Sequence, residues 1–547
     1  MKQLETEVLV VGAGPVGLVL AGDLGWRGRR CLVVEMGDGE IFQPKMDQVG
    51  IRTMEFCRRW GIVQDVEASP YDRDYPQDNV YLTAMTGYEL GRESFPSMRE
   101  DRPPPDSPQK RERCPQNMFD PILRRFAESQ PGVQMRYRHE LLSFTQDARG
   151  VTARVRDLET REEVAVRAQY IVGCDGGKSQ VRQQLNIPMQ GRGLLTYTTN
   201  VIFRCPEFNS LHDKRPGYRY MFVGPDGIWA TIVAINGKDN WRMSLVGNAQ
   251  EKVIYSEEQL REIAHRLMGK PFPLEILSVL RWARRELVAD RYRDGRAFLC
   301  GDACHLTSPT GGLGMNTGIG DAVDLSWKLD AVLAGWGGDV LLESYGIERR
   351  PIAVRITRFS TGNLEIMKGA RSSEKLYEDS EEGRLVRERV GRALTEGLKR
   401  EWFSMNMHLG YRYVDSPINL YTEQESREQI EQEYADGMNY RPGTRPGSRA
   451  PHAWLADGRS MLDLYGRGFV LLLFADAHGD PEALAAAAAA RGVPLQVVRI
   501  HDAGAQALYE RSCVLVRPDG HVAWRGDALP EDGVAVVQIV SGNYKEI

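Results

Sequence analysis

The chain has few cysteines, and their spacing suggests neither a metal site nor a set of disulfides. Its 547 residues include eight, at positions 31, 57, 114, 174, 205, 300, 304 and 513. No two of them form a CxxC pair, although structural metal sites and small disulfide frameworks usually depend on such clustering. We therefore expect reduced, mostly structural thiols and no bound metal ion.

Long apolar runs and an excess of one charge are also lacking. No segment approaches the roughly 18 uncharged apolar residues of a membrane helix, and Met1 to Leu9 leads directly into a predicted strand instead of a signal peptide. The net charge is -5, from 70 Lys and Arg against 75 Asp and Glu. This balance gives no basic field for nucleic acid or an anionic membrane. We expect a cytoplasmic protein with neither of these partners.

The N-terminus carries a glycine turn typical of nucleotide-binding proteins. An apolar run, Val8 to Val11, precedes Gly12-Ala13-Gly14-Pro15-Val16-Gly17, and a helical pattern follows to about Gly28. A second apolar run, Cys31 to Val34, ends in Glu35, where an acid would bind the hydroxyls of an adenosine ribose. The glycines let the backbone approach a pyrophosphate, and the helix N-terminus supplies N–H donors for it. The pattern predicts a dinucleotide site but leaves NAD, NADP and FAD open.

A later segment, Arg296 to Leu333, has the features of a second contact with the same cofactor. Ala297 to Cys300 is apolar enough for a buried strand, and Gly301-Asp302 places a carboxylate past its carboxyl end, where open α/β sheets bind ligands. Pro309 and a run of glycines then lead into a helical pattern from about Asn316. The N-terminus of a helix carries roughly half a positive charge. It would favour an electron-rich ring system such as a reduced flavin.

The middle of the chain predicts more strands. Ile171 to Ser179 repeats the order of strand, glycines and helix, with Asp175 in the turn. From about Leu194 to Arg285, alternating runs separated by turn signals predict an antiparallel sheet that forms one wall of a pocket. Its aromatic side chains are either sheet core or contacts for a flat substrate, and Tyr220 and Trp229 are the candidates for such contacts.

Three charged or proline-rich segments are predicted to be exposed or to connect other parts. Glu93 to Pro115 is expected to be an exposed excursion. Leu341 to about Met407 is predicted to be helical with a break at Glu381-Glu382-Gly383, and Ser380 to Lys399 is either a solvated face or a surface for another subunit. Tyr440 to Pro451, rich in Pro, Gly and Arg, is expected to be a linker.

The chain resembles the FAD-dependent aromatic hydroxylases, which are single-component flavoprotein monooxygenases, over its full length. Among them it is similar to the phenol, dichlorophenol and 3-(3-hydroxyphenyl)propionate hydroxylases. Three motifs carry the likeness: the Gly12 to Gly17 turn with Glu35, Cys174-Asp175-Gly176, and Gly301-Asp302 followed by Pro309 and Gly311 to Asn316. The cofactor contacts that the resemblance implies are Gly12, Gly14, Pro15, Val16, Gly17, Glu35, Lys45, Gln116, Asp175, Asp302, Pro309, Gly312, Gly314, Met315 and Asn316.

By the same resemblance, NADPH or NADH reduces the FAD, O2 adds to form a flavin C4a-hydroperoxide, and its terminal oxygen passes to a phenolic ring. A carboxylate that removes the phenolic proton would make the ring more nucleophilic. Asp47 is the candidate, because it precedes Arg52-Thr53 by five residues as the corresponding aspartate does in the phenol hydroxylases; alternatively, it only orders its loop. His305 either relays protons or bonds the loop backbone. The family also suggests a homodimer.

The expected fold is α/β: a Rossmann-like FAD-binding domain with an inserted antiparallel-sheet substrate domain, and a C-terminal thioredoxin-like domain without a CxxC. The FAD-binding domain covers 1–185, with part of the substrate lobe at about 75–115. The substrate domain covers 186–290, a second FAD-binding segment with a helical region covers 291–440, and the C-terminal domain covers 441–547. Because no second nucleotide fingerprint lies between Gln183 and Gly295, we expect transient binding of the nicotinamide.

Two alternative functions stay open on the sequence. One is an FAD monooxygenase that acts on a polycyclic, polyketide or other substrate that is not a simple phenol, by hydroxylation, epoxidation or Baeyer–Villiger oxidation. The other is a flavin-binding interaction protein without catalysis, suggested by the separate C-terminal module. The intact glycines and Asp302 favour an enzyme over this second alternative.

Overall fold

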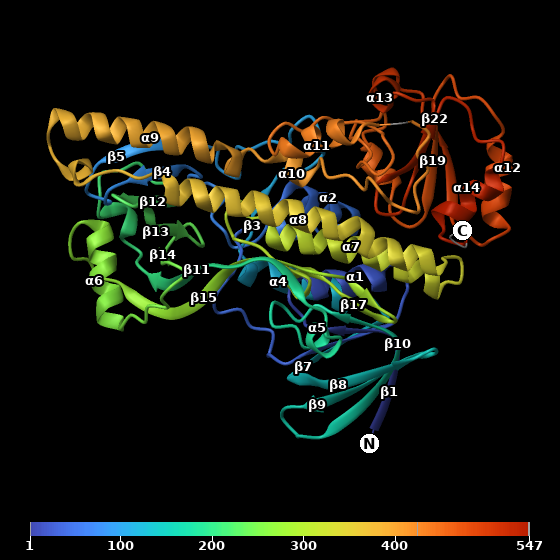
Figure 1. Ribbon diagram of the computed structural model, residues 1–547, viewed down its shortest axis with the longest axis horizontal. Helices are drawn as coiled ribbons and strands as arrows, with labels where there is room; N and C mark the ends of the chain where they lie inside the picture. Colours follow the sequence, from blue (N-terminus) through green and yellow to red (C-terminus); the bar gives the residue numbers. More distant parts are fainter. Residues whose placement is uncertain (1, 424, 545–547) are drawn as a thin grey trace.

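The computed structural model describes residues 2–423 and 425–544, and a mostly parallel sheet carries the N-terminal glycine turn (Figure 1). The strand order is β16-β17-β10-β1-β2-β7, and β17, β10, β1, β2 and β7 run parallel. The apolar runs Val8 to Val11 and Cys31 to Val34 are buried, as expected where helices cover a parallel sheet. The bounds are β1 (Lys2–Val11), α1 (Pro15–Trp26), β2 (Cys31–Glu35), α4 (Gln116–Glu128), β7 (Val133–Tyr137), β8 (His139–Asp147), β9 (Gly150–Asp157), β10 (Glu163–Gly173), α5 (Gln180–Gln184), β16 (Arg293–Asp294), β17 (Ala297–Leu299) and α7 (Gly314–Leu333).

A second eight-stranded sheet forms the other lobe, in the order β18-β15-β11-β14-β13-β12-β4-β5. The antiparallel pairing predicted for the middle of the chain is present in β15-β11-β14-β13-β12, and β4 joins β12 in parallel. One face packs on α6 around Phe203, Phe222 and Trp241. The bounds are β4 (Asn79–Leu82), β5 (Glu89–Glu93), β11 (Met189–Arg204), β12 (Arg219–Gly224), β13 (Gly227–Ala234), β14 (Asn240–Val246), α6 (Glu257–Met268), β15 (Glu275–Ala289) and β18 (His305–Leu306).

Two long helices pack on the second sheet. Helix α8 (Asp339–Gly369) runs across the molecule from the second sheet toward the C-terminal module, and α9 (Glu381–Trp402) lies above the β4 and β5 end of that sheet (Figure 1). Val390 and Leu394 of α9 are buried against this chain's own residues. The opposite side of α9, with Glu382, Glu388 and Arg392, is exposed. Ser380 to Lys399 therefore has one face packed within the chain and one solvated face, as the first alternative expected, while contact with another subunit stays a prediction. Among the residues described, no helix is long and apolar enough to cross a bilayer.

The helix break predicted at Glu381-Glu382-Gly383 was wrong. The interruption spans residues 370–380, and Glu381 is the first residue of α9. The Ser380 hydroxyl accepts a hydrogen bond from the Gly383 N–H, which is an N-cap. The shorter elements are β3 (Gln48–Val49), α2 (Ile51–Trp60), α3 (Val63–Glu67), β6 (Glu112–Arg113), α10 (Met405–His408) and α11 (Arg427–Ala435).

The prediction that Glu93 to Pro115 is an exposed excursion was wrong for its second half. Ser107, Lys110 and Glu112 are buried. The Glu112 carboxylate accepts hydrogen bonds from Lys110 and Arg73, and the Ser107 hydroxyl donates to Glu55 of α2. Charge and proline indicated irregular backbone correctly, but Lys110 and Glu112 are paired inside the protein.

The C-terminal module is built on a four-stranded sheet in the order β20-β19-β21-β22. Its β19 and β20 are parallel, and β21 and β22 form an antiparallel hairpin, in the order that the sequence predicted. The likeness to a thioredoxin-like domain stays a prediction. The bounds are β19 (Phe469–Leu473), α12 (Pro481–Ala489), β20 (Leu495–Arg499), α13 (Ala503–Tyr509), β21 (Cys513–Val516), β22 (Val522–Gly526) and α14 (Gly533–Val540).

The segment Tyr440 to Pro451 is packed and does not behave as a free linker. Thr444, Arg449 and Ala450 are buried, and the Arg449 guanidinium donates two hydrogen bonds to Glu55 in α2, the closer at 2.5 Å. The expected linker therefore fixes the C-terminal module to α2.

A buried network of charges joins the module to α7 and α8. The Arg517 guanidinium lies 2.6 Å from Glu348, 3.2 Å from Asp324 and 2.8 Å from Asp519. Lys328 also contacts Asp324 and Glu348. These side chains have at most 2% of their surface exposed, so each carboxylate depends on its cationic partners instead of water.

We expect Arg517→Met to lower the free energy of unfolding by about 3–5 kcal/mol, because it leaves buried carboxylates without their partner. Denaturant unfolding followed by circular dichroism measures this loss. Arg511→Met is the matched control, since the ion pair between Arg511 and Glu423 is about 38% exposed on each side; it should cost less than about 1 kcal/mol. Equal losses in the two variants would contradict the role given to the buried network.

Candidate active site

The glycine turn before α1 has two glycines that the fold requires and one that faces open space. Gly12 has a φ of +102°, and a Cβ there would lie 2.5 Å from the Cys174 carbonyl oxygen. A Cβ on Gly17 would lie 2.0 Å from the Gly12 carbonyl oxygen. At Gly14, the N-cap of α1, no atom lies within 4 Å of an added Cβ, and no side chain caps the helix. The turn thus leaves a backbone surface and uncapped N–H donors for an anion such as a pyrophosphate.

The second cofactor segment touches the first. A Cβ on Gly301 would lie 2.9 Å from the Val16 side chain, and one on Gly318 would lie 2.7 Å from it. Val16 therefore fits between the end of β17 and the first turns of α7. The structure brings together the two segments that the sequence suggested as contacts of one cofactor.

Two carboxylates lie at the carboxyl ends of parallel strands. Glu35 is the last residue of β2, and its side chain accepts hydrogen bonds from the Ala13 N–H at 2.8 Å and from the Gly37 N–H at 2.7 Å. Asp302 follows β17 and is exposed. Both positions suit acids that bind ribose or ribityl hydroxyls at this edge of the sheet.

Asp175 has a structural use that the sequence did not indicate. Its carboxylate accepts hydrogen bonds from the N–H groups of Gln180 and Val181 in the first turn of α5. Burial raises the pKa of Asp175 above its ordinary value. The turn abuts Gly12 through the Cys174 carbonyl, so a cofactor in the glycine turn would lie close to its backbone.

The N-terminus of α7 is open. The helix begins at Gly314 without a side-chain cap, and space is free around the Cα of Gly312. The Asn316 side-chain oxygen accepts hydrogen bonds from the Gly50 N–H and the Thr53 hydroxyl, each at 2.7 Å. This end of α7 is thus joined to the loop before α2, and its free N–H groups suit an electron-rich ring. The other contacts predicted here are Pro309, which is exposed, and Met315, which is half-buried.

The loop before β3 is tied to α4. The Lys45 N–H donates to the Gln116 side-chain oxygen at 3.1 Å, and the Gln116 amide donates to Asp120 at 3.0 Å. Burial raises the pKa of Asp120 to about 7. The Lys45 side chain is exposed and remains available to a pyrophosphate, while Gln116 holds its backbone.

Asp47 lies where this loop meets the second sheet. Its carboxylate accepts hydrogen bonds from both terminal nitrogens of Arg242, one at 3.0 Å, and from the Tyr218 hydroxyl at 3.1 Å. Arg242 belongs to β14, and Tyr218 immediately precedes β12. The side chain of Asp47 is 12% exposed. The sequence indicated neither Arg242 nor Tyr218 as a site residue.

We define the inner face of the second sheet as the face that carries Asn200, Arg219, Arg242 and Arg284. Arg242 of β14 pairs with Val233 of β13, which pairs with Arg219 of β12, and Asn200 of β11 is two residues from the partner of Arg242. On β15, Arg284 is two residues from Trp282, the partner of Thr198, and Thr198 is two residues from Asn200. Side chains directly opposite or two residues apart share one face of a sheet. Glu401 of α9 connects this face to the cofactor segment. Its carboxylate binds Arg219 at 3.0 Å and accepts a hydrogen bond from the Gly311 N–H at 3.0 Å.

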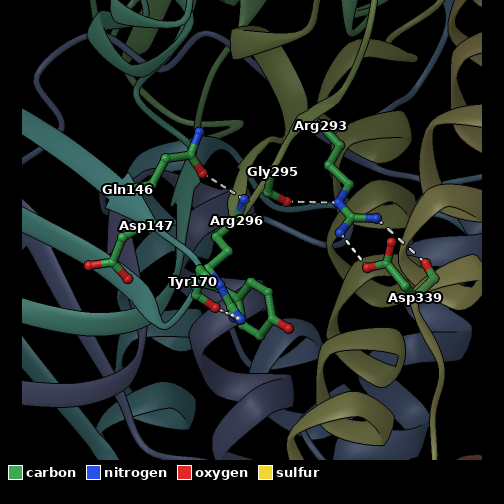
Figure 2. Close-up of a pocket in the computed structure, with 8 residues that line it drawn as sticks. Gln146, Asp147, Tyr170, Arg293, Gly295, Arg296 and Asp339 are labelled. Atoms are coloured by element: carbon green, nitrogen blue, oxygen red, sulfur yellow. Dashed lines mark hydrogen bonds and ion pairs between the residues drawn. The ribbon is translucent and has the colours of Figure 1, made fainter.

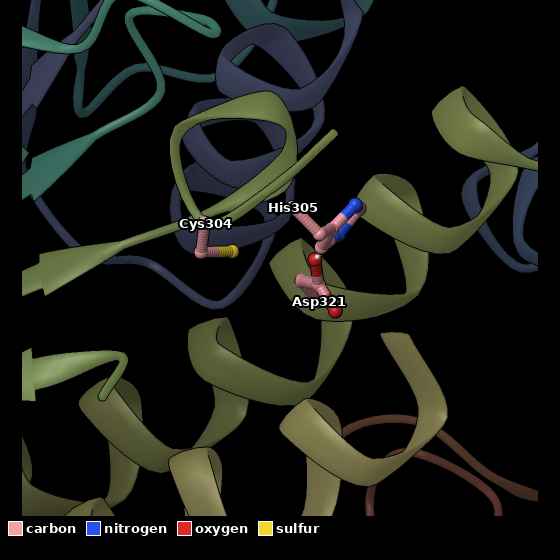
Figure 3. A group of neighbouring side chains, drawn as sticks. All are labelled: Cys304, His305 and Asp321. Carbon is pink, nitrogen blue, oxygen red and sulfur yellow. Dashed lines mark hydrogen bonds and ion pairs between the residues drawn. The ribbon is translucent and has the colours of Figure 1, made fainter. Parts of the chain in front are cut away.

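His305 of β18 is buried in the packing between α7 and α8. Its Nε2 is 2.7 Å from Asp321, whose other oxygen accepts a hydrogen bond from Arg349 at 2.8 Å. Cys304, His305 and Asp321 form a compact group (Figure 3) with their potential ligand atoms within 4.8 Å of one another. A dication there would meet the buried Arg349 guanidinium, which makes the group unsuitable for a metal ion.

Tyr220 and Trp229 lie on the α6 side of the second sheet. Tyr220 is fully buried in the apolar core, and its hydroxyl accepts a hydrogen bond from the Gly217 N–H. Trp229 packs against the same core, with Arg266 of α6 over its ring at 4.9 Å. This packing corresponds to the sheet-core alternative for both aromatic residues.

A pocket of about 360 Å³ lies at the opposite edge of the first sheet (Figure 2). Arg293 and Arg296 line it beside Tyr170, at the point where β17 begins. The Arg293 guanidinium already binds Asp339 and the Gly295 carbonyl. Because Asp302 follows the other end of β17, this pocket is separate from the cofactor edge.

Comparison with known proteins agrees with this geometry. The family described as "FAD binding domain" matches residues 5–360, and "Aromatic-ring hydroxylase, C-terminal" matches residues 443–539. The FAD-dependent monooxygenase apdD of Emericella nidulans is 31% identical, over 98% of this chain and 90% of the relative. The 2,4-dichlorophenol 6-monooxygenase of Delftia acidovorans is also 31% identical, over 95% of each chain. The structure of RebC soaked with chromopyrrolic acid and holding 7-carboxy-K252c is 37% identical, with a TM-score of 0.91 over 99% of this chain and 100% of RebC. The chain belongs to the FAD-dependent monooxygenases of the aromatic-ring hydroxylase family.

Proposed function

We propose that the protein hydroxylates a phenolic aromatic substrate with NADPH or NADH and O2. The observation that carries this proposal is the position of Asp47. Its carboxylate lies between the loop that accompanies the cofactor segments and the inner face of the second sheet, held by Arg242 and Tyr218. A carboxylate there is within reach of a ring placed between the two lobes.

The described residues fit FAD. The uncapped turn at Gly14 would hold the pyrophosphate, Glu35 the adenosine ribose and Asp302 the ribityl chain, while the open end of α7 would hold the pyrimidine edge of the ring. When bound, FAD supplies the electron transfer and oxygen activation that amino-acid side chains lack. No parallel strand–helix–strand unit occurs among the described residues of 186–290, which supports transient binding of the nicotinamide.

Asp47 is the proposed proton acceptor for the substrate hydroxyl. Arg242 and Tyr218 orient its carboxylate, and the Glu401 link between Gly311 and Arg219 keeps the second sheet fixed against the cofactor segment. Removal of the phenolic proton raises the electron density of the ring, and a positioned base typically contributes about 10²–10⁴-fold to such a step.

A second candidate is the oxygenation of a polycyclic substrate. The likeness to RebC, whose structure holds 7-carboxy-K252c, is closer at 37% identity than the 31% to the dichlorophenol monooxygenase. This difference favours a larger ring system than a simple phenol, although a fold hosts many substrates.

Nicotinamide oxidation by the purified FAD-loaded protein tests the proposal. NADPH or NADH is supplied with single-ring phenols, chlorophenols, hydroxyphenylpropionates and polycyclic phenols, and oxygenated product and H2O2 are counted separately. We expect one phenol to accelerate the oxidation of NADPH or NADH and to be converted to a product with an added hydroxyl group. If only polycyclic phenols do so, the second candidate is correct. If every substrate gives one H2O2 for each NADPH or NADH oxidised and no oxygenated product, the proposed hydroxylation is wrong.

A further inference from the structure

One guanidinium on the inner face has no carboxylate partner. Arg284 of β15 is 5% exposed, and its Nε donates to the Thr198 hydroxyl at 3.0 Å. One of its terminal nitrogens, Nη1, is buried without a hydrogen-bond partner in the described part of the chain. By contrast, Arg219 is paired with Glu401 and Arg242 with Asp47.

The three guanidinium groups of Arg219, Arg242 and Arg284 thus have only two carboxylate partners among the residues described, Asp47 and Glu401. The interactions of Arg284 involve the cations Arg219 and Arg242 and the carboxylate of Glu401, which already binds Arg219. Burial and the Arg219 guanidinium lower the pKa of Arg284 to about 10, so the side chain still carries its charge at neutral pH. An uncompensated buried charge is among the most costly features of a folded protein.

Other buried polar atoms of the inner face or bound to it also lack partners within the described residues. The side-chain oxygen of Asn200 and one oxygen of Glu401 are also buried without hydrogen-bond partners among residues 2–423 and 425–544. Asn200 extends from β11 on the inner face, and Glu401 reaches it from α9. Buried polar groups are almost always hydrogen-bonded in native structures. Unsatisfied groups that share one face of the sheet indicate that a polar ligand completes their bonding.

We infer that Arg284 binds an anionic group of the aromatic substrate, and that the preferred substrates are aromatic carboxylic acids. This inference deepens the proposed function and depends on it. A carboxylate matches the planar guanidinium and can accept two of its hydrogen bonds. The neighbouring amide and carboxyl oxygens would then accept hydrogen bonds from hydroxyl or N–H groups of the same molecule.

Binding of matched probes to the FAD-loaded protein tests the inference without turnover. The probes are 3-hydroxy-2-naphthoate and its neutral carboxamide, titrated through the change they cause in the flavin absorbance. We expect the parent to prefer the acid, and Arg284→Met to weaken binding of the acid by about 30-fold or more while leaving the amide unchanged. Arg285→Met, at the exposed neighbouring position, should behave as the parent. A parent that binds acid and amide equally would overturn the inference.

Thermal unfolding separates this role from a structural one. Without a ligand, Arg284→Met should unfold at the same temperature as the parent or a higher one, because an unpaired buried charge has been replaced by an apolar side chain. The naphthoate should raise the unfolding temperature of the parent but not of this variant. A lower unfolding temperature with unchanged selectivity would make Arg284 a structural residue.

Two further outcomes assign the anion and the reaction. If Arg284→Met weakens the binding of NADPH instead of the naphthoate, the site recognises a nucleotide phosphate and the inference about the substrate fails. If the acid binds through Arg284 but no tested acid gains oxygen during turnover, the proposed hydroxylation fails while the anion site stands.

Discussion

Gly17→Ala is expected to yield a protein without FAD, with an affinity for the cofactor reduced by at least about 100-fold. The added Cβ would lie 2.0 Å from the Gly12 carbonyl oxygen. Gly12 cannot move away, because its own Cα faces the Cys174 carbonyl and it holds a φ of +102° that favours glycine. Helix α1 would have to separate from β1, and the pyrophosphate site would open. Flavin content and titration of the apoprotein with FAD measure the effect.

Gly14→Ala is the matched control. Gly14 has a φ of -72°, which any residue adopts, and its added Cβ meets no atom within 4 Å. The apoprotein should therefore keep the stability of the parent, whereas FAD should bind more weakly because the methyl group enters the space that a pyrophosphate would approach. If Gly17→Ala purifies with as much flavin as the parent, the cofactor does not occupy this turn.

The parts of the fold that the sequence predicted well are those set by local pattern. The glycine turn, the apolar strands and the order of elements along the C-terminal module follow from residues close together in the chain. Burial of charged segments could not be predicted in the same way. Glu55 is paired with Arg449, 394 residues away, so composition alone made Tyr440 to Pro451 resemble a linker and Glu93 to Pro115 an exposed excursion.

The candidate site also contains residues that local sequence predicted and residues that it did not. Glu35 and Asp302 were found because each follows a predicted strand directly. Asp47 was suggested by a resemblance, but its partner Arg242 comes 195 residues later on a sheet whose register decides which face each side chain occupies. A shift of one residue would turn Arg242 toward α6. Arg284 and Glu401 were missed for the same reason, since no local motif marks them.

Asp47→Asn is expected to lower the rate of phenol hydroxylation by about 10²–10⁴-fold, while FAD binding and reduction by NAD(P)H stay intact. The amide removes the negative charge that would accept the phenolic proton, yet it can still accept a hydrogen bond from Arg242. The measurement uses the phenol that gives most product with the parent, with product and H2O2 counted separately and flavin reduction followed under anaerobic conditions.

Loss of activity alone would not assign Asp47 as a base, because its charge also compensates the buried Arg242 guanidinium. The dependence on pH separates the two roles. If Asp47 accepts the proton, the variant should regain activity as the pH approaches the pKa of the free phenol, near 10 for a tyrosine-like hydroxyl, since the substrate then arrives ionised. Tyr218→Phe is the matched control: it removes one hydrogen bond to Asp47 but keeps the carboxylate, and should lower the rate by less than about 10-fold. A variant that stays inactive at every pH, with Tyr218→Phe equally impaired, would mean that Asp47 positions Arg242 and that another group takes the proton.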